Sequence, residues 1–144
     1  MATVFDVAEY ILKKCGSLTV MKLQKLVYYS QAWSLVWDER PLFRARIEAW
    51  ANGPVVPALY RAHRGFYSVS RHSFDGDPSA LTNSEVGTVN AVIRHYGKRD
   101  SSYLSQLTHR EAPWSDARRG LSAGERGNNE ITHAALAEYY SSLQ

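Results

Sequence analysis

The spacing of apolar residues along the chain predicts helices over most of its length. Between positions 4 and 15 apolar residues recur every three or four positions, as on one buried helix face, and Gly16 stands where such a helix would end. Further helices are expected over residues 20–37, 83–96 and 133–143, because a Leu-Thr or Ile-Thr pair precedes each segment and threonine caps helix N-termini. The chain is therefore expected to be mainly helical.

The segment 20–37 is apolar on two sides. Leu23 and Leu26 belong to one face, and Tyr28 lies on a second face nearly opposite. The narrow strip that remains, which is expected to face water, consists of Lys22, Lys25 and Tyr29. A helix that is apolar on two sides belongs at the centre of a bundle, so the sequence predicts a compact helical bundle around residues 20–37.

The middle of the chain has a different pattern. Residues 42–52 alternate partly between apolar and polar positions, which predicts a strand, with a helix as the alternative. Residues 66–70 are expected to supply a strand that pairs with it, so the predicted β structure is at most a two-stranded ribbon. Short helices are expected over residues 55–65 and 102–111, and another beginning at Pro113.

The stretch "WANGPVVPALYR" interrupts this apolar run with two prolines. Asn52 and Gly53 predict a turn, because glycine adopts backbone angles that other residues avoid and the position before a proline disfavours helix. Pro54 and Pro57 are expected in the first turn of the next helix, where a missing N–H group costs little. The stretch is interpreted as a structural corner, with anion binding at the helix start as the alternative.

Length, charge and cysteine content indicate one ordinary folded domain, residues 1–144. The net charge of +3 is interspersed along the chain and predicts a mildly basic surface. Cys15 is the single cysteine and cannot form an internal disulfide. The N-terminus lacks the pattern of a signal peptide, and residues 20–37 carry too many polar side chains for a membrane span. A cytoplasmic protein with no membrane association is expected.

Catalytic and metal-binding patterns are missing from the sequence. The five histidines are scattered without metal-ligand spacing, and no phosphate-binding glycine loop or nucleophile elbow is present. No metal, no cofactor and no enzymatic activity are therefore expected. The alternative is a hydrolase in which His109 and Glu111 converge with a distant nucleophile in one pocket.

The chain is rich in aromatic residues, with four tryptophans and nine tyrosines. Most of these rings are expected in the core, but tryptophan, tyrosine and arginine also supply most of the binding energy at protein interfaces. The short helix behind the prolines is expected to present such side chains outward. The predicted partner-binding cluster consists of Tyr60, Arg61, His63 and Arg64.

Three motifs, in their order and spacing, resemble the Panacea domain, the family that includes SocA-like antitoxins and phage-associated proteins. They are K-L-Q-K-L-x-Y at 22–28, W-x-x-G-P-V at 50–55 and T-H-x-x-x-P-W at 108–114. The side chains that carry the resemblance are Lys22, Leu23, Lys25, Leu26, Tyr28, Trp50, Gly53, Pro54, His109, Pro113 and Trp114. The similarity extends over roughly residues 5–140.

The resemblance implies a non-enzymatic role. Members are typically antitoxins that neutralise a toxin protein by direct binding, including toxic small alarmone synthetases and other toxins that block translation or replication. SocA-like members act instead as adaptors that deliver the toxin to a ClpXP-type protease. A bacterial or phage-encoded antitoxin is thus expected. The alternative is a nucleic-acid-binding regulator that uses the Arg61/Arg64 helix or the Arg118/Arg119 pair, although nucleic acid is the less expected partner.

Overall fold

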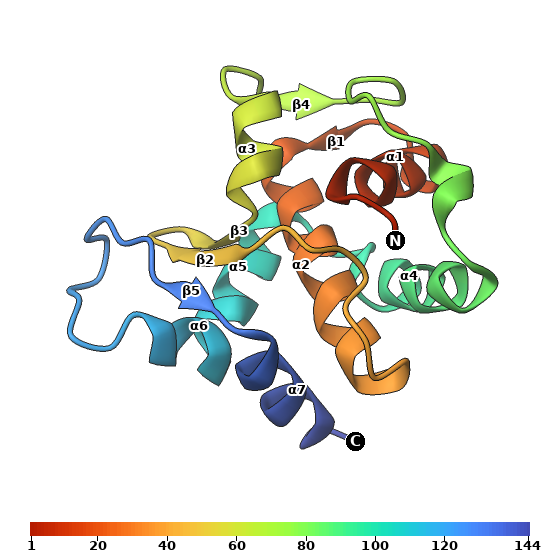
Figure 1. Cartoon of the computed structure of the whole chain (residues 1–144). Helices are drawn as coiled ribbons and strands as arrows, with labels where there is room; N and C mark the ends of the chain where they lie inside the picture. The colour runs from red at the N-terminus through yellow and green to blue at the C-terminus, as the bar shows by residue number, and fades with distance from the viewer.

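Helix α2 runs through the middle of the protein, and the other helices surround it (Figure 1). The computed structural model describes all 144 residues. Its helices are α1 (Val4–Cys15), α2 (Val20–Trp37), α3 (Pro57–His63), α4 (Asn83–Tyr96), α5 (Ser101–His109), α6 (Ala112–Ala117) and α7 (His133–Ser141), and a 3-10 turn, η1 (Pro78–Ala80), precedes α4. The prediction of a mainly helical bundle around residues 20–37 is confirmed.

Side-chain caps fix the helix starts where the sequence predicted them. The hydroxyl groups of Thr19, Thr82 and Thr132 each accept a hydrogen bond from the backbone N–H group three residues further on. In α4 the Glu85 carboxylate also accepts a hydrogen bond from the Thr82 N–H group, which completes a capping box. The Asp100 carboxylate accepts a hydrogen bond from the Tyr103 N–H group and so caps α5. Local sequence therefore sets the boundaries of the long helices.

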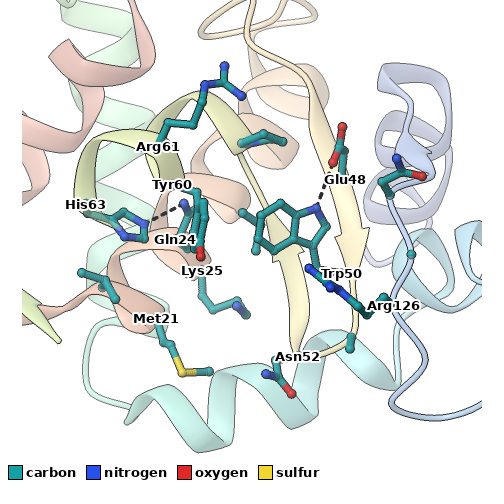
Figure 2. A pocket seen from close by; sticks show the side chains of 16 residues that line it. Met21, Gln24, Lys25, Glu48, Trp50, Asn52, Tyr60, Arg61, His63 and Arg126 are labelled. Carbon is teal, nitrogen blue, oxygen red and sulfur yellow. Dashed lines mark hydrogen bonds between the residues drawn. The ribbon is translucent and has the colours of Figure 1, made fainter. Parts of the chain in front are cut away.

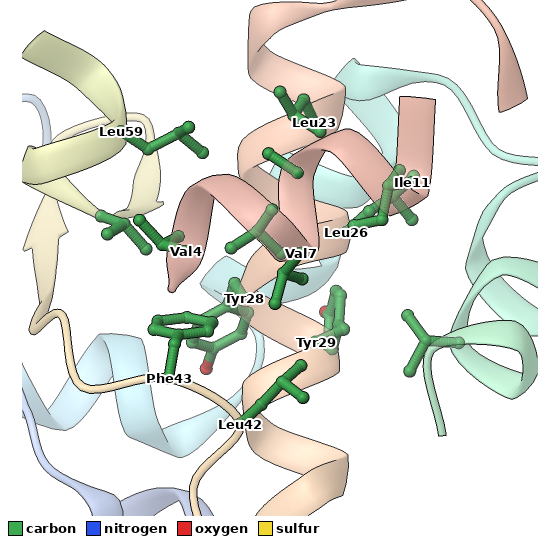
Figure 3. Packing of buried hydrophobic residues seen from close by; sticks show 14 of the residues in the cluster. Val4, Val7, Ile11, Leu23, Leu26, Tyr28, Tyr29, Leu42, Phe43 and Leu59 are labelled. Carbon is green, nitrogen blue, oxygen red and sulfur yellow. The ribbon is translucent and has the colours of Figure 1, made fainter. Parts of the chain in front are cut away.

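Both apolar faces of α2 contribute residues to one cluster of 29 buried hydrophobic residues. Figure 3 shows Leu23 and Leu26 of α2 beside α1, with Tyr28 further along the same helix near Phe43. All four of these side chains are almost completely removed from water. Burial of this many large apolar groups is the main force that holds the bundle together.

The predicted polar strip of α2 is wrong at two of its three positions. Tyr29 is fully buried and its ring stacks on that of Tyr96, with 3.9 Å between centroids. Lys25 is only 2% exposed. Lys22 alone is partly exposed, and its ammonium group donates a hydrogen bond to the Gly97 carbonyl at 2.6 Å. Helical periodicity missed this because Gly53 of β3 lies against Lys25 while α4 and α7 cover Tyr29, and those contacts come from distant parts of the chain.

The β structure consists of two small antiparallel sheets. One has three strands in the order β3 (Gly53–Val55), β2 (Ile47–Trp50), β5 (Glu130–Ile131). The other pairs β1 (Leu18–Thr19) with β4 (Ser68–Val69). The strand predicted within residues 42–52 is confirmed as β2, and its helical alternative is wrong.

The predicted partner of that strand is also wrong, and the β structure exceeds a single two-stranded ribbon. Strand β4, from the segment expected to pair with β2, lies instead against β1 at the start of α2. A two-residue turn at 51–52 folds β3 back onto β2, and β5 returns from far along the chain to the other edge. Alternation within one segment cannot reveal which distant strand will reach it.

The two prolines have different roles. Gly53 has φ +129°, which confirms the predicted turn. Pro57 occupies the first turn of α3, as predicted, but Pro54 does not: it lies in the edge strand β3, opposite Ala49 of β2. An edge strand tolerates proline because the missing N–H group can face away from the ladder. The corner therefore closes a hairpin first and begins a helix afterwards.

Candidate functional site

A pocket of about 800 Å³ opens where the start of α2, the turn between β2 and β3, helix α3 and residues 126–128 come together (Figure 2). Its walls carry the aromatic rings of Trp50 and Tyr60 and the positively charged side chains of Lys25, Arg61 and Arg126. The hairpin corner places these groups together, since it joins the strand that carries Trp50 to the helix that carries Tyr60 and Arg61.

Lys25 is the unusual residue of this pocket. Its side chain extends from α2 into the pocket, yet it is only 2% exposed (Figure 2). The ammonium group makes one hydrogen bond, to the carbonyl oxygen of Pro54 at 3.5 Å, and no ion pair. Burial lowers the pKa of Lys25 to about 8, so the group is still mostly charged at neutral pH.

Gly53 leaves the space that the Lys25 side chain fills. A Cβ atom at position 53 would lie 2.6 Å from Cε and 3.0 Å from Nζ of Lys25, and 3.3 Å from Oγ1 of Thr108. Those distances are shorter than ordinary contacts, so any larger residue at position 53 would displace the lysine. The glycine of the second motif thus leaves room for the observed position of the lysine of the first.

The third motif lies against the same corner. The His109 ring stacks on Trp114, with 3.9 Å between centroids, and the indole N–H group of Trp114 donates a hydrogen bond to the Trp50 carbonyl at 2.8 Å. The buried Nε2 atom of His109 has no hydrogen-bond partner. Burial lowers the pKa of His109; the backbone of Asn52 opposes this, and the charges of Lys25 and Arg118 add to the lowering. Residues of all three motifs therefore meet beside the pocket.

The remaining motif residues support the fold. Leu23 and Leu26 are fully buried, and the Tyr28 hydroxyl shares a hydrogen bond with that of Tyr140 at 3.0 Å. Pro113 is buried in the first turn of α6, which begins one residue earlier than predicted. Lys22 fastens α2 to the end of α4.

His63 does not belong to the exposed cluster that the sequence predicted. It is 3% exposed, and its Nε2 atom lies 3.0 Å from the side-chain nitrogen of Gln24. The Gln24 amide also bonds both the N–H and the carbonyl group of Val56 at the start of α3. Burial lowers the pKa of His63, which favours the neutral ring. His63 therefore anchors the base of α3, because it lies on the face that packs against α2.

The other members of the predicted cluster are accessible. Arg61 and Arg64 are exposed, and Tyr60 is half-buried because its ring packs edge-to-face against Trp50, with 4.8 Å between centroids. Their role in partner binding stays a prediction. The structure adds Trp50, Lys25 and Arg126 as neighbours on the same pocket.

The acidic residue of the pocket is already engaged. Glu48 forms an ion pair with Arg46 at 3.0 Å and accepts a hydrogen bond from the Trp50 indole at 2.9 Å. None of the three pocket cations, Lys25, Arg61 and Arg126, forms an ion pair. The pocket is therefore positively charged overall.

Arg118 holds the segment that supplies one wall of the pocket. Its buried guanidinium group donates hydrogen bonds to the carbonyl oxygens of Ala49, Ser122 and Glu125, at 3.1, 3.3 and 2.5 Å. It thereby ties the loop after α6 to strand β2. The predicted Arg118/Arg119 surface pair is wrong, since only Arg119 is exposed.

The third motif also contains a buried carboxylate. Glu111 accepts hydrogen bonds from the hydroxyl groups of Tyr29 and Tyr140, at 2.7 and 2.8 Å, and so joins α2 and α7. Burial raises the pKa of Glu111, and the two tyrosine hydrogen bonds partly offset that rise. Glu111 and His109 form no hydrogen bond with each other. Glu111 is thus bonded to tyrosine hydroxyl groups and not to His109.

Three apolar side chains on segments that adjoin the pocket are exposed to solvent. Met21, which lines it, is 41% exposed, and Phe66 and Tyr67 are 65% and 82% exposed. The backbone of Phe66 bonds to that of His63, and the backbone of Tyr67 bonds to that of Val20, both at 3.0 Å, and His63 and Val20 line the pocket. We call Met21, Phe66 and Tyr67 the apolar rim.

The structure has neither a metal-binding cluster nor a helix suited to span a membrane. No three histidine, cysteine, aspartate or glutamate side chains cluster closely enough to hold a metal ion. None of the helices combines the length and apolar character needed to cross a membrane.

The sequence did not show which residues would line the pocket. Gln24 could have been noticed, because it lies between two apolar motif positions on a helix that is buried on most sides. The burial of Lys25 and the position of Arg126 could not have been predicted from the sequence, since both depend on contacts between segments that are distant in sequence. The pocket forms only where the hairpin corner, α2 and residues 126–128 come together in the folded chain.

These features define a small helical domain in which three sequence motifs converge beside an open, positively charged and aromatic pocket. The family model described as "Antitoxin SocA-like, Panacea domain" matches residues 23–115, which is more than half of the chain. The chain therefore belongs to the SocA-like Panacea domain family, and the resemblance inferred from the motifs is confirmed.

A curated relative agrees with this assignment. Antitoxin SocA of Caulobacter vibrioides (strain NA1000 / CB15N) is 41% identical over 59 residues, which cover 38% of this chain and 31% of that protein. The match thus spans less than a third of the relative's length. No solved structure matches the chain.

Proposed function

We propose that the protein is an antitoxin that neutralises a toxin protein by binding it directly. Membership of the SocA-like Panacea family, through the match over residues 23–115, is the observation that carries this proposal. The open pocket and the apolar rim support it, because exposed aromatic and apolar side chains beside a cleft are typical of protein-binding surfaces. Binding alone accounts for the proposed neutralisation, so the proposed role requires no catalytic step.

The proposed toxin is a cytoplasmic protein that blocks translation or replication, a toxic small alarmone synthetase being one example. The name of the curated relative supports an antitoxin in general. Delivery of the toxin to a ClpXP-type protease is a second form of the same proposal, and it also begins with direct binding. The two forms differ in what happens to the toxin after it is bound.

Co-expression with the neighbouring gene tests this proposal. We expect that the neighbouring product stops growth when expressed alone, that growth recovers when this chain is present, and that the two proteins co-purify. If the toxin level stays constant in cells with and without ClpX, neutralisation is direct; a fall that requires ClpX identifies an adaptor. A neighbouring product that is harmless alone, or toxic whether or not this chain is present, contradicts the proposal.

The nucleic-acid alternative has lost one of its two predicted surfaces. Arg118 donates its hydrogen bonds to backbone carbonyl groups and is buried. The predicted surface that remains consists of Arg61 and Arg64 at α3, which are both exposed. That alternative requires an affinity for DNA that falls steeply as salt concentration rises. A gel-shift titration between low and physiological salt measures it, and we expect no complex at physiological salt.

A further inference from the structure

Lys25 has the features of a ligand-binding group rather than a structural one. Its ammonium nitrogen is buried, points into the pocket and has a single long hydrogen bond, to Pro54 (Figure 2). A buried charge without a partner is costly, and an apolar side chain of similar length would fill the same space without that cost. The structure therefore contains a cation whose partner is not supplied by this chain.

The charges around Lys25 indicate what that partner carries. Arg61 and Arg126 also line the pocket without ion pairs, whereas the carboxylate of Glu48 is engaged with Arg46 and Trp50. Complementary charge at an interface selects the partner and steers its approach. A group that enters this pocket is therefore expected to be acidic.

The apolar surroundings indicate that the acidic group belongs to a protein. Trp50 and Tyr60 form an aromatic wall inside the pocket, and the exposed apolar rim consists of Met21, which lines it, and of two residues whose backbones bond to pocket-lining residues. A small free anion would leave these rings and the rim uncovered, and a volume of about 800 Å³ exceeds what one such anion fills. A polypeptide segment would use both parts, because aromatic anchors with charged neighbours are typical of protein interfaces.

We propose that the Lys25 pocket is the toxin-binding site and that it receives an acidic segment of the toxin, with an aspartate or glutamate carboxylate at Lys25 and an apolar side chain between Trp50, Tyr60 and the rim. This inference rests on the proposed antitoxin function and goes beyond it by naming the contact and its chemistry. The site lies at the point where the three family motifs meet.

The test compares Lys25→Met with Lys22→Met in isothermal titrations against the purified toxin. Both lysines belong to α2, but the Lys22 ammonium group bonds to Gly97 and Lys22 does not line the pocket. We expect Lys25→Met to weaken binding by about tenfold or more, because the toxin carboxylate would be buried without a cation, and Lys22→Met to change affinity less than about twofold. Thermal unfolding of each variant shows that it is folded.

Exposed positions provide a second variant that does not depend on the core. Arg61→Glu combined with Arg126→Glu reverses two pocket charges at the surface, and Arg119→Glu is the matched control away from the pocket. We expect the double variant to lose detectable toxin binding while the control binds as the wild type does.

The outcomes separate this inference from the function on which it rests. If the wild type binds no neighbouring product, the antitoxin function fails and this inference fails with it. If the wild type binds but folded Lys25→Met and the double variant bind equally well, the toxin docks elsewhere and only this inference is overturned. Displacement of the bound toxin by duplex DNA at physiological salt would also overturn it.

Discussion

Lys25 donates its only hydrogen bond to the carbonyl oxygen of Pro54, across a distance of 3.5 Å. Ordinary hydrogen bonds of this type are nearer 2.9 Å, so the contact satisfies the buried ammonium group poorly. The turn at Gly53 brings the carbonyl to this position and leaves room for the lysine. A fold selected for stability alone would not keep a buried charge with so poor a partner. Functional sites often retain groups that cost stability, so this pair is consistent with a functional role for Lys25.

Lys25→Met is expected to stabilise the protein at neutral pH. The unfolded lysine has a pKa of 10.5 and the folded one about 8, so folding disfavours the charged form. At 1.4 kcal/mol per pKa unit the burial of the charge costs about 3 kcal/mol below pH 8. We expect the free energy of unfolding, measured by urea titration at pH 7, to increase by about 1–3 kcal/mol in the variant.

The pH dependence of stability gives an independent check of the same residue. Between pH 8 and 10 the unfolded chain binds more protons at this position than the folded chain, so the Lys25 contribution makes wild-type stability rise with pH. Burial raises the pKa of Tyr28 and Tyr29, so these groups act in the opposite direction above about pH 10. The difference in the free energy of unfolding between the wild type and Lys25→Met, plotted against pH, cancels the tyrosine contributions that both proteins share. If this difference stays constant from pH 7 to 10, Lys25 is not a buried charged group.

Gly53→Ala is expected to destabilise the protein more than Gly65→Ala does. Both glycines have positive φ angles, +129° and +93°, so both substitutions strain the backbone by about 1–2 kcal/mol. Only at position 53 would the added Cβ atom meet Lys25; at position 65 no atom lies within 4 Å. We expect thermal unfolding to show an extra loss of about 1 kcal/mol for Gly53→Ala. Equal losses would mean that the lysine moves aside freely.

Arg118→Ala is expected to destabilise the loop of residues 121–129, which supplies the pocket wall at 126–128. Three backbone carbonyl groups lose their donor, which costs about 2–4 kcal/mol. Arg119→Ala, which removes an exposed ion pair with Asp116, should change stability by less than about 0.5 kcal/mol. Hydrogen exchange of the amides in residues 121–129 should accelerate in Arg118→Ala alone. Unchanged exchange there would show that the loop does not depend on the guanidinium group.

The Arg61→Ala/Arg64→Ala double variant is expected to weaken toxin neutralisation without loss of stability. Both side chains are exposed and unpaired, so the free energy of unfolding should change by less than about 0.5 kcal/mol. Tyr60→Ala should weaken neutralisation too, but it should also cost about 1 kcal/mol, because its ring packs on Trp50. A co-expression growth assay beside urea unfolding measures both effects. Full neutralisation by the arginine variant would remove these residues from the interface.

Local signals in the sequence predicted the helices well and the site only in part. Thr19, Thr82 and Thr132 cap their helices because a cap depends on a few adjacent residues. The burial of Lys25 and Tyr29 was missed, since the elements that cover that side of α2 come from segments distant in the chain. The Gly-Pro corner was recognised as a turn, but its partner strand β2 placed Pro54 in a sheet instead of a helix.

The predicted interface shows the same limit. Arg61 was expected on the surface of α3 and is exposed, whereas His63, two residues later, faces α2 and bonds to Gln24. A helix of seven residues gives too little periodicity to decide which side is covered. The motif resemblance identified the family correctly, but the meeting of Lys25, Gly53 and His109 beside one pocket required the folded structure.

The most direct test of the central claim is an isothermal titration of the purified protein with the purified product of the neighbouring toxic gene, at pH 7 and physiological salt. Direct neutralisation predicts a saturable complex with a dissociation constant of about 1 µM or tighter, and loss of toxin activity over the same concentration range. Full toxin activity at saturating concentrations of this protein, with no heat of binding, would contradict the account.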